Sequence, residues 1–104
     1  MTFRVDWSLE AEGGLLRTYD YLLEREIQRE GNLALARRAL EAICNAVRSL
    51  ESAPFLFRKI GESPFLRELV VPFGTRGYVL AYEILAEDWV VIAAMRHQRE
   101  DDYY

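Results

Sequence analysis

The sequence predicts an α+β domain in which a helical hairpin packs on a mainly antiparallel sheet. Apolar and polar residues alternate with a period of two over 3–8, as in a half-buried strand. Over 9–52 apolar residues recur every three or four positions instead, which is typical of amphipathic helices. Three strand-like runs then follow between 66 and 96, separated by breaks short enough for hairpins. The predicted order is therefore β-α-α-β-β-β within a single domain, residues 1–104.

The first strand and the first helix meet at Ser8. The alternate residues before it are apolar: Phe3, Val5 and Trp7. A serine hydroxyl can accept a hydrogen bond from a backbone N–H of the next turn, so we expect Ser8 to cap a helix over 9–30. Gly13 and Gly14 lie inside this helix, and each costs on the order of 1 kcal/mol relative to alanine. Either the helix begins late, or it packs closely against another element there.

Gly31 and Asn32 predict the end of the first helix and the N-cap of a second. The second helix is expected from 33 to about 52, and its apolar stripe is spaced by three or four: Ala36, Leu40, Ile43, Val47 and Leu50. Cys44 is expected to be a small core residue. Because the connection is short, the two helices should form an antiparallel hairpin.

Pro54 ends the helical pattern, and residues 55–65 have no regular periodicity. The runs at 66–71, 78–85 and 89–96 should pair antiparallel, with breaks at 72–75 and 86–88. The last run is apolar on both faces. It is therefore expected to be a central strand, with helices on one face and another cover, such as a partner chain, on the other.

The composition limits the kinds of functional site that the chain can form. The 104 residues are 51% hydrophobic and 29% charged, which is a globular profile. One cysteine and one histidine, His97, are too few for an internal disulfide or for a Cys-rich or His-rich metal site. We therefore expect no metal and no cofactor. The apolar runs are too short to cross a membrane and no secretory signal is evident, so the expected location is the cytoplasm, with no membrane partner.

The charge balance disfavours a general nucleic-acid-binding surface. Seventeen acidic residues outweigh 13 basic ones, which gives a net charge of −4 and a pI near 5.0. Lys59 is the only lysine, and arginine suits bidentate, partly buried contacts better than lysine does. Basic and aromatic residues become dense again after residue 95, at the end of the chain.

His97 could act as a general base, but only with suitable neighbours. The candidates on the strands and at the C-terminus are Arg67, Arg76, Arg96, Arg99, Tyr78, Tyr82, Tyr103 and Tyr104. A metal-free cluster of arginine, histidine and tyrosine can cleave RNA, because the attacking group is the 2′-hydroxyl and cations stabilise the charge developing on phosphate. Alternatively, the arginines only solvate a strand edge, the tyrosines are core or partner-facing aromatics, and the terminal residues form a polar tail.

Three segments carry a resemblance that covers essentially the whole chain. They read Leu-Arg-Glu-Leu-Val-Val at 66–71, Arg-Gly-Tyr-Val-Leu-Ala-Tyr at 76–82, and Val-Ile-Ala-Ala-Met-Arg-His-Gln-Arg-Glu-Asp at 91–101. The opening Val-Asp-Trp-Ser at 5–8 and Tyr-Asp-Tyr-Leu at 19–22 also fit. In order and spacing they resemble the RelE/ParE superfamily of type II toxin–antitoxin toxins.

The resemblance implies one of two activities. RelE-like members are small basic ribonucleases that cut mRNA in the ribosome, whereas ParE-like members poison DNA gyrase by trapping cleaved DNA. Members of both branches are neutralised by an antitoxin encoded beside them, whose C-terminal segment wraps the toxin. A cognate antitoxin, ParD-like or related, is therefore the first expected partner.

About half of the residues in the nuclease pattern are present in this sequence. Its two basic positions on the second strand correspond to Arg67 and Leu69, and its arginine after the Gly-Tyr pair corresponds to Val79. His97 could fill the basic position after the last strand, and Tyr103 aligns approximately with the final tyrosine. Valine cannot make a charge-assisted contact to phosphate, and the acidic pI disfavours approach to the ribosome.

The resemblance therefore favours the ParE-like branch, a gyrase inhibitor that is not an enzyme. A RelE-like ribosome-dependent mRNA endoribonuclease using Arg67, His97 and Tyr103 is the alternative, and an inactive member that only binds its antitoxin is a third. Arginine and tyrosine are common at binding hot spots, so the expected target contacts are Arg67, Arg96, His97, Arg99 and Tyr103. Antitoxin binding is expected at apolar residues of the first helix and third strand: Leu15, Leu22, Tyr78 and Tyr82.

Overall fold

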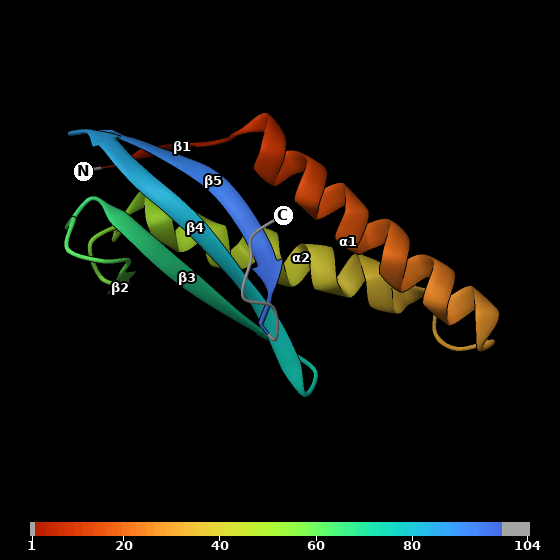
Figure 1. Cartoon of the computed structure of the whole chain (residues 1–104). Helices are drawn as coiled ribbons and strands as arrows, with labels where there is room; N and C mark the ends of the chain where they lie inside the picture. The colour runs from red at the N-terminus through yellow and green to blue at the C-terminus, as the bar shows by residue number, and fades with distance from the viewer. Residues whose placement is uncertain (1, 99–104) are drawn as a thin grey trace.

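The computed structural model describes residues 2–98 and has two helices packed on one face of a five-stranded sheet (Figure 1). The elements are β1 (Arg4–Trp7), α1 (Leu9–Gln28), α2 (Ala34–Arg48), the 3₁₀ helix η1 (Ser49–Glu51), β2 (Arg58–Lys59), β3 (Leu66–Phe73), β4 (Arg76–Ala86) and β5 (Trp89–His97). The strand order is β1-β5-β4-β3-β2. Only β1 and β5 pair in parallel, which confirms the predicted α+β class.

Ser8 caps α1 as predicted. Its hydroxyl oxygen accepts a hydrogen bond from the Ala11 N–H at 3.0 Å and donates one to the Ala93 carbonyl at 2.9 Å. The Ser8 side chain therefore lies at the junction of β1 and α1 and connects this junction to β5 by a hydrogen bond. The helix does not begin late at its glycine pair, because α1 runs from Leu9 without a break and buries Gly14.

The connection between the helices differs from the prediction by one residue. Glu30, not Gly31, adopts the left-handed conformation after α1, with φ of +50°. The Gly31 N–H then donates to the carbonyl of Glu26 at 2.8 Å. Glycine is needed at 31 for a different reason, because a Cβ there would lie 2.5 Å from the buried Glu26 carboxylate. Asn32 is not the N-cap of the next helix, contrary to the prediction, because Leu33 occupies that position; the Asn32 Oδ1 still accepts a hydrogen bond from the Ala34 N–H at 3.0 Å.

The stripe predicted for the second helix is confirmed, with four of its residues buried and Leu40 half-buried. Cys44, however, is exposed, so its prediction as a core residue is wrong. One residue on a helix turns the side chain by about 100°, and Ile43 already points into the core. Cys44 therefore points away from the sheet.

The three C-terminal strands are longer than predicted, and their turns are shorter. Pro72 and Phe73 belong to β3, which leaves Gly74 and Thr75 as the turn, and Gly74 has φ of +63°. β5 lies between β1 and β4, so it is a central strand as predicted. The buried residues of β3, β4 and β5 that face the helices form the core: Leu69, Val71, Tyr78, Leu80, Tyr82, Ile84, Val90, Ile92 and Met95. No helix of residues 2–98 covers the opposite face, here called the open face.

Candidate functional site

The strand register divides the predicted site residues between the two faces of the sheet. On β4, Val79 is paired with Val70 of β3 and with Arg96 of β5. Tyr78, its neighbour, is paired with His97 and faces the helices. Because side chains alternate along a strand, Arg96 lies on the open face while His97 lies on the helix side. Arg96 and His97, which were predicted to act together at the end of β5, therefore lie on opposite faces of the sheet.

Arg67 binds the backbone of the loop before β3. Its Nε donates to the Pro64 carbonyl at 2.7 Å, and its Nη1 donates to the carbonyls of Phe55 at 2.9 Å and Phe57 at 2.7 Å. The guanidinium also lies over the Phe55 ring, 5.3 Å from its centroid. These contacts use three of the five N–H donors that arginine has. They give Arg67 a role in holding the loop.

The residues proposed for the nuclease alternative do not converge. Arg67 is paired with Tyr82 and His97 with Tyr78, four residues apart on β4. At about 3.3 Å per residue this separates them by roughly 13 Å along the strand. Tyr103, like Arg99, lies outside the described residues.

A charge cluster occupies the open face next to Val79. The Glu68 carboxylate pairs with Arg58 of the edge strand β2 at 2.7 Å and with Arg96 of β5 at 3.7 Å. Arg58 Nε adds a hydrogen bond of 3.0 Å to the same carboxylate. The Glu68 carboxylate on β3 therefore faces one guanidinium group from β2 and another from β5. Neither Arg58 nor Glu68 was singled out from the sequence. Pairing residue 71 with residue 78 would have placed Glu68 on the same face of the sheet as Val79.

The two β4 tyrosines are buried beneath α1 and α2. His97 packs edge-on against the Tyr78 ring, with centroids 5.6 Å apart. Burial raises the pKa of Tyr78, partly offset by Arg25 and reinforced by Tyr21. Tyr82 is fully buried, and its hydroxyl donates to the Pro54 carbonyl at 2.6 Å. Burial raises the pKa of Tyr82 to about 12, although the nearby Arg67 lowers it.

Most of the residues expected to bind the antitoxin are buried. Leu22, Tyr78 and Tyr82 are all buried. All three belong to the core between the helices and the sheet, which leaves a partner no surface there. Leu15 differs, because it is half-buried and lies where α1 meets α2.

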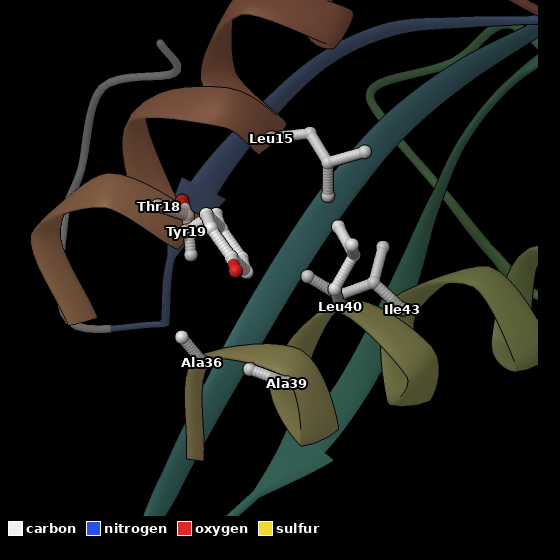
Figure 2. Close-up of a pocket in the computed structure, with 7 residues that line it drawn as sticks. All are labelled: Leu15, Thr18, Tyr19, Ala36, Ala39, Leu40 and Ile43. Carbon is white, nitrogen blue, oxygen red and sulfur yellow. The ribbon is translucent and has the colours of Figure 1, made fainter. Parts of the chain in front are cut away.

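Leu15 lines an apolar hollow between the two helices. Figure 2 shows its side chain and Tyr19 extending from α1 toward α2, with Leu40 and Ile43 extending from α2. The lining residues are Leu15, Thr18, Tyr19, Ala36, Ala39, Leu40 and Ile43, and they pack closely enough to leave no room for a water molecule among them. The hollow is therefore apolar surface rather than a cavity, and it suits contact with an apolar side chain of a partner better than enclosure of a ligand.

No cluster of three or more His, Cys, Asp or Glu residues in 2–98 is arranged to hold a metal ion. Within the same residues, no helix has the length and apolar character needed to span a membrane.

One family model matches most of the chain. Residues 5–102 match the family model described as the ParE toxin of the type II toxin–antitoxin system parDE. Two proteins of Caulobacter vibrioides are similar in sequence. Toxin RelE3 is 42% identical over 65 residues, 62% of this chain and 67% of that protein, and toxin RelE1 is 36% identical over 85 residues, 82% and 83% of the two chains.

A solved structure described as the chromosomal ParDE TA system from P. aeruginosa has the same fold. Its TM-score is 0.69 at 18% sequence identity, and the match covers 96% of this chain and 98% of that one. At this identity the likeness concerns the fold alone.

Proposed function

Because the chain belongs to the ParE toxin family of type II toxin–antitoxin systems, we propose that it inhibits DNA gyrase and that a cognate antitoxin neutralises it. Such an inhibitor acts by binding. To trap cleaved DNA it must bind the gyrase–DNA intermediate more tightly than the resting enzyme, because a ligand shifts an equilibrium only through its difference in affinity between states.

The observation that carries this proposal is Val79. It lies in the middle of the open face, where the nuclease pattern requires an arginine, and only 2% of its surface is exposed. The nearest cations on that face, Arg58 and Arg96, are opposed by Glu68. A phosphate there would meet valine and a carboxylate, which neither bind it nor stabilise charge developing on it. This supports a toxin that binds a protein over one that cleaves RNA.

The names of the Caulobacter relatives favour a second candidate, the ribosome-dependent ribonuclease. The two candidates separate in paired assays of the purified toxin, one with gyrase and supercoiled DNA, the other with translating ribosomes. We expect inhibition of gyrase and intact mRNA. The nuclease candidate predicts the reverse, with mRNA cutting reduced about 10²–10⁴-fold by His97→Ala. An inactive member would show neither activity and no growth arrest.

For the antitoxin, we propose that an apolar side chain of its helix packs against the surface of the hollow between α1 and α2. Replacing Leu15 with glutamate should then weaken antitoxin binding about 10- to 100-fold, because a charge would enter an apolar contact. Isothermal titration calorimetry measures this. Leu16→Glu is the matched control, since Leu16 is exposed on α1 and does not line the hollow. Equal affinities for both variants at unchanged melting temperature would contradict this placement.

A further inference from the structure

Three large apolar side chains are exposed together where the chain passes from η1 to β3. Phe55 is 48% exposed, Leu56 76% and Phe65 50%. The two phenylalanine rings pack edge to face, with centroids 6.2 Å apart, and Leu56 adjoins Phe55 in the chain. We call these three residues the aromatic corner. Exposed aromatic side chains are enriched at the contact sites of proteins.

The aromatic corner is held rigidly, although it is exposed. Arg67 binds the carbonyls of Phe55, Phe57 and Pro64 at once. The backbone carbonyl of Phe65 accepts from the Ile84 N–H of β4 at 2.8 Å, and Pro54 accepts from the buried Tyr82 hydroxyl. Both ends of the loop are therefore fixed to the sheet. A preorganised surface loses less conformational entropy when it binds a partner.

One exposed lysine lies close in sequence to the aromatic corner. Segment 54–67 holds three basic residues, of which Arg58 is paired with Glu68 and Arg67 with backbone carbonyls. Lys59 lies on the edge strand β2, opposite Arg67, and is exposed. Among residues 2–98, no carboxylate forms an ion pair with Lys59. A partner with carboxylates beside its apolar contact would complement this pattern.

These features fit a protein better than a single-stranded nucleic acid. Leu56 is the most exposed of the three residues, and an aliphatic side chain offers no ring on which a base can stack. Phosphate binding also needs several unopposed cations, whereas Arg58 is paired with Glu68 and Arg67 with backbone carbonyls. Aromatic and arginine side chains around an exposed apolar centre are typical of protein interfaces.

We propose that the aromatic corner is the surface by which this toxin binds its protein target, inside an apolar cleft rimmed by carboxylates. This inference rests on the proposed function, in which the target is a protein. It uses a different surface from the antitoxin hollow, which is formed by residues 15–43 of the helices. Figure 1 places β2, which lies between Leu56 and Phe65 in the chain, at the end of the molecule away from the α1–α2 connection.

The test compares Leu56→Glu and Lys59→Glu with the matched control Leu9→Glu. Leu9 is 88% exposed on α1, so the control adds the same charge as Leu56→Glu at an exposed leucine elsewhere, whereas Lys59→Glu also removes a positive charge. The concentration of toxin that half-inhibits gyrase should rise about tenfold or more for the two corner variants. It should change by no more than about twofold for Leu9→Glu. Melting temperature and antitoxin affinity should match the wild type in all three.

The other outcomes distinguish failure of this inference from failure of the proposed gyrase target. Corner variants as potent as the wild type, or variants that lose antitoxin binding, overturn this inference. If the wild type leaves gyrase unaffected, the proposed target fails, and growth arrest in cells becomes the readout for the corner. Loss of arrest in Leu56→Glu with intact antitoxin binding then supports the inference. Retained arrest, or no arrest by the wild type, overturns it.

Discussion

Replacing Gly77 with alanine should lower the free energy of unfolding by at least about 3 kcal/mol or prevent folding. Gly77 of β4 is paired with Pro72 of β3. A Cβ at position 77 would overlap the carbonyl oxygen of Val71 and lie 3.0 Å from the Pro72 Cα. These atoms are backbone, so no side-chain rotation can relieve the overlap. Urea denaturation of the purified protein measures the loss.

Gly13→Ala is the matched control for this substitution. The added Cβ on α1 would meet only the flexible end of Arg17, with Nη1 at 3.2 Å. Alanine is favoured over glycine in a helix by about 1 kcal/mol, so this variant should be as stable as the wild type or more stable. If Gly77→Ala were as stable as Gly13→Ala, the pairing of β3 with β4 described above would be wrong, and with it the position of Val79.

The free energy of unfolding should fall steeply between pH 10 and pH 12, and Tyr82 should cause most of the fall. Burial raises the pKa of Tyr82 from 10.0 to about 12. Below pH 10 both the folded and the unfolded chain keep this proton. Above it the unfolded chain loses the proton first, so stability is lost at about 1.4 kcal/mol per pH unit, or some 2–3 kcal/mol by pH 12. Burial also raises the pKa of Tyr78, which acts in the same direction.

Tyr82→Phe isolates this effect. The variant should lose about 1–2 kcal/mol at neutral pH, because the Pro54 carbonyl loses its hydrogen bond, but its stability should fall less between pH 10 and pH 12. Tyr21→Phe serves as the control, since Tyr21 is exposed, and it should keep the steep alkaline loss. Chemical denaturation at a series of pH values measures both. An alkaline loss in Tyr82→Phe as steep as in the wild type would contradict this role.

The parts of the fold that local chemistry determines were predictable from the sequence. Ser8 caps a helix through its own hydroxyl, and the stripe of α2 follows from helical spacing alone. β2 was missed because two residues cannot show alternation. The position of the left-handed residue was missed because the buried Glu26 carboxylate, rather than backbone preference, requires glycine at 31.

The site was less predictable because its residues depend on register and on loop conformation. The pairing of 71 with 78 follows from the hairpin, and it places Arg67 opposite Tyr82 rather than beside Val79. If this register had been applied to the sequence, Arg67 would not have been grouped with the residues proposed for the nuclease. The contacts of Arg67 with Phe55 and Phe57 depend on a loop that has no periodic pattern. The burial of Leu22 depends on how α1 packs on the sheet, which its stripe alone does not specify.

We propose that this toxin acts on gyrase by binding and not on RNA by catalysis. The most direct measurement is the amount of cleaved DNA that accumulates when purified gyrase, ATP and plasmid DNA are mixed with antitoxin-free toxin. We predict that cleaved DNA accumulates with toxin concentration and disappears when the cognate antitoxin is added. Unchanged supercoiling and no cleaved DNA, with mRNA cut on translating ribosomes, would contradict the claim.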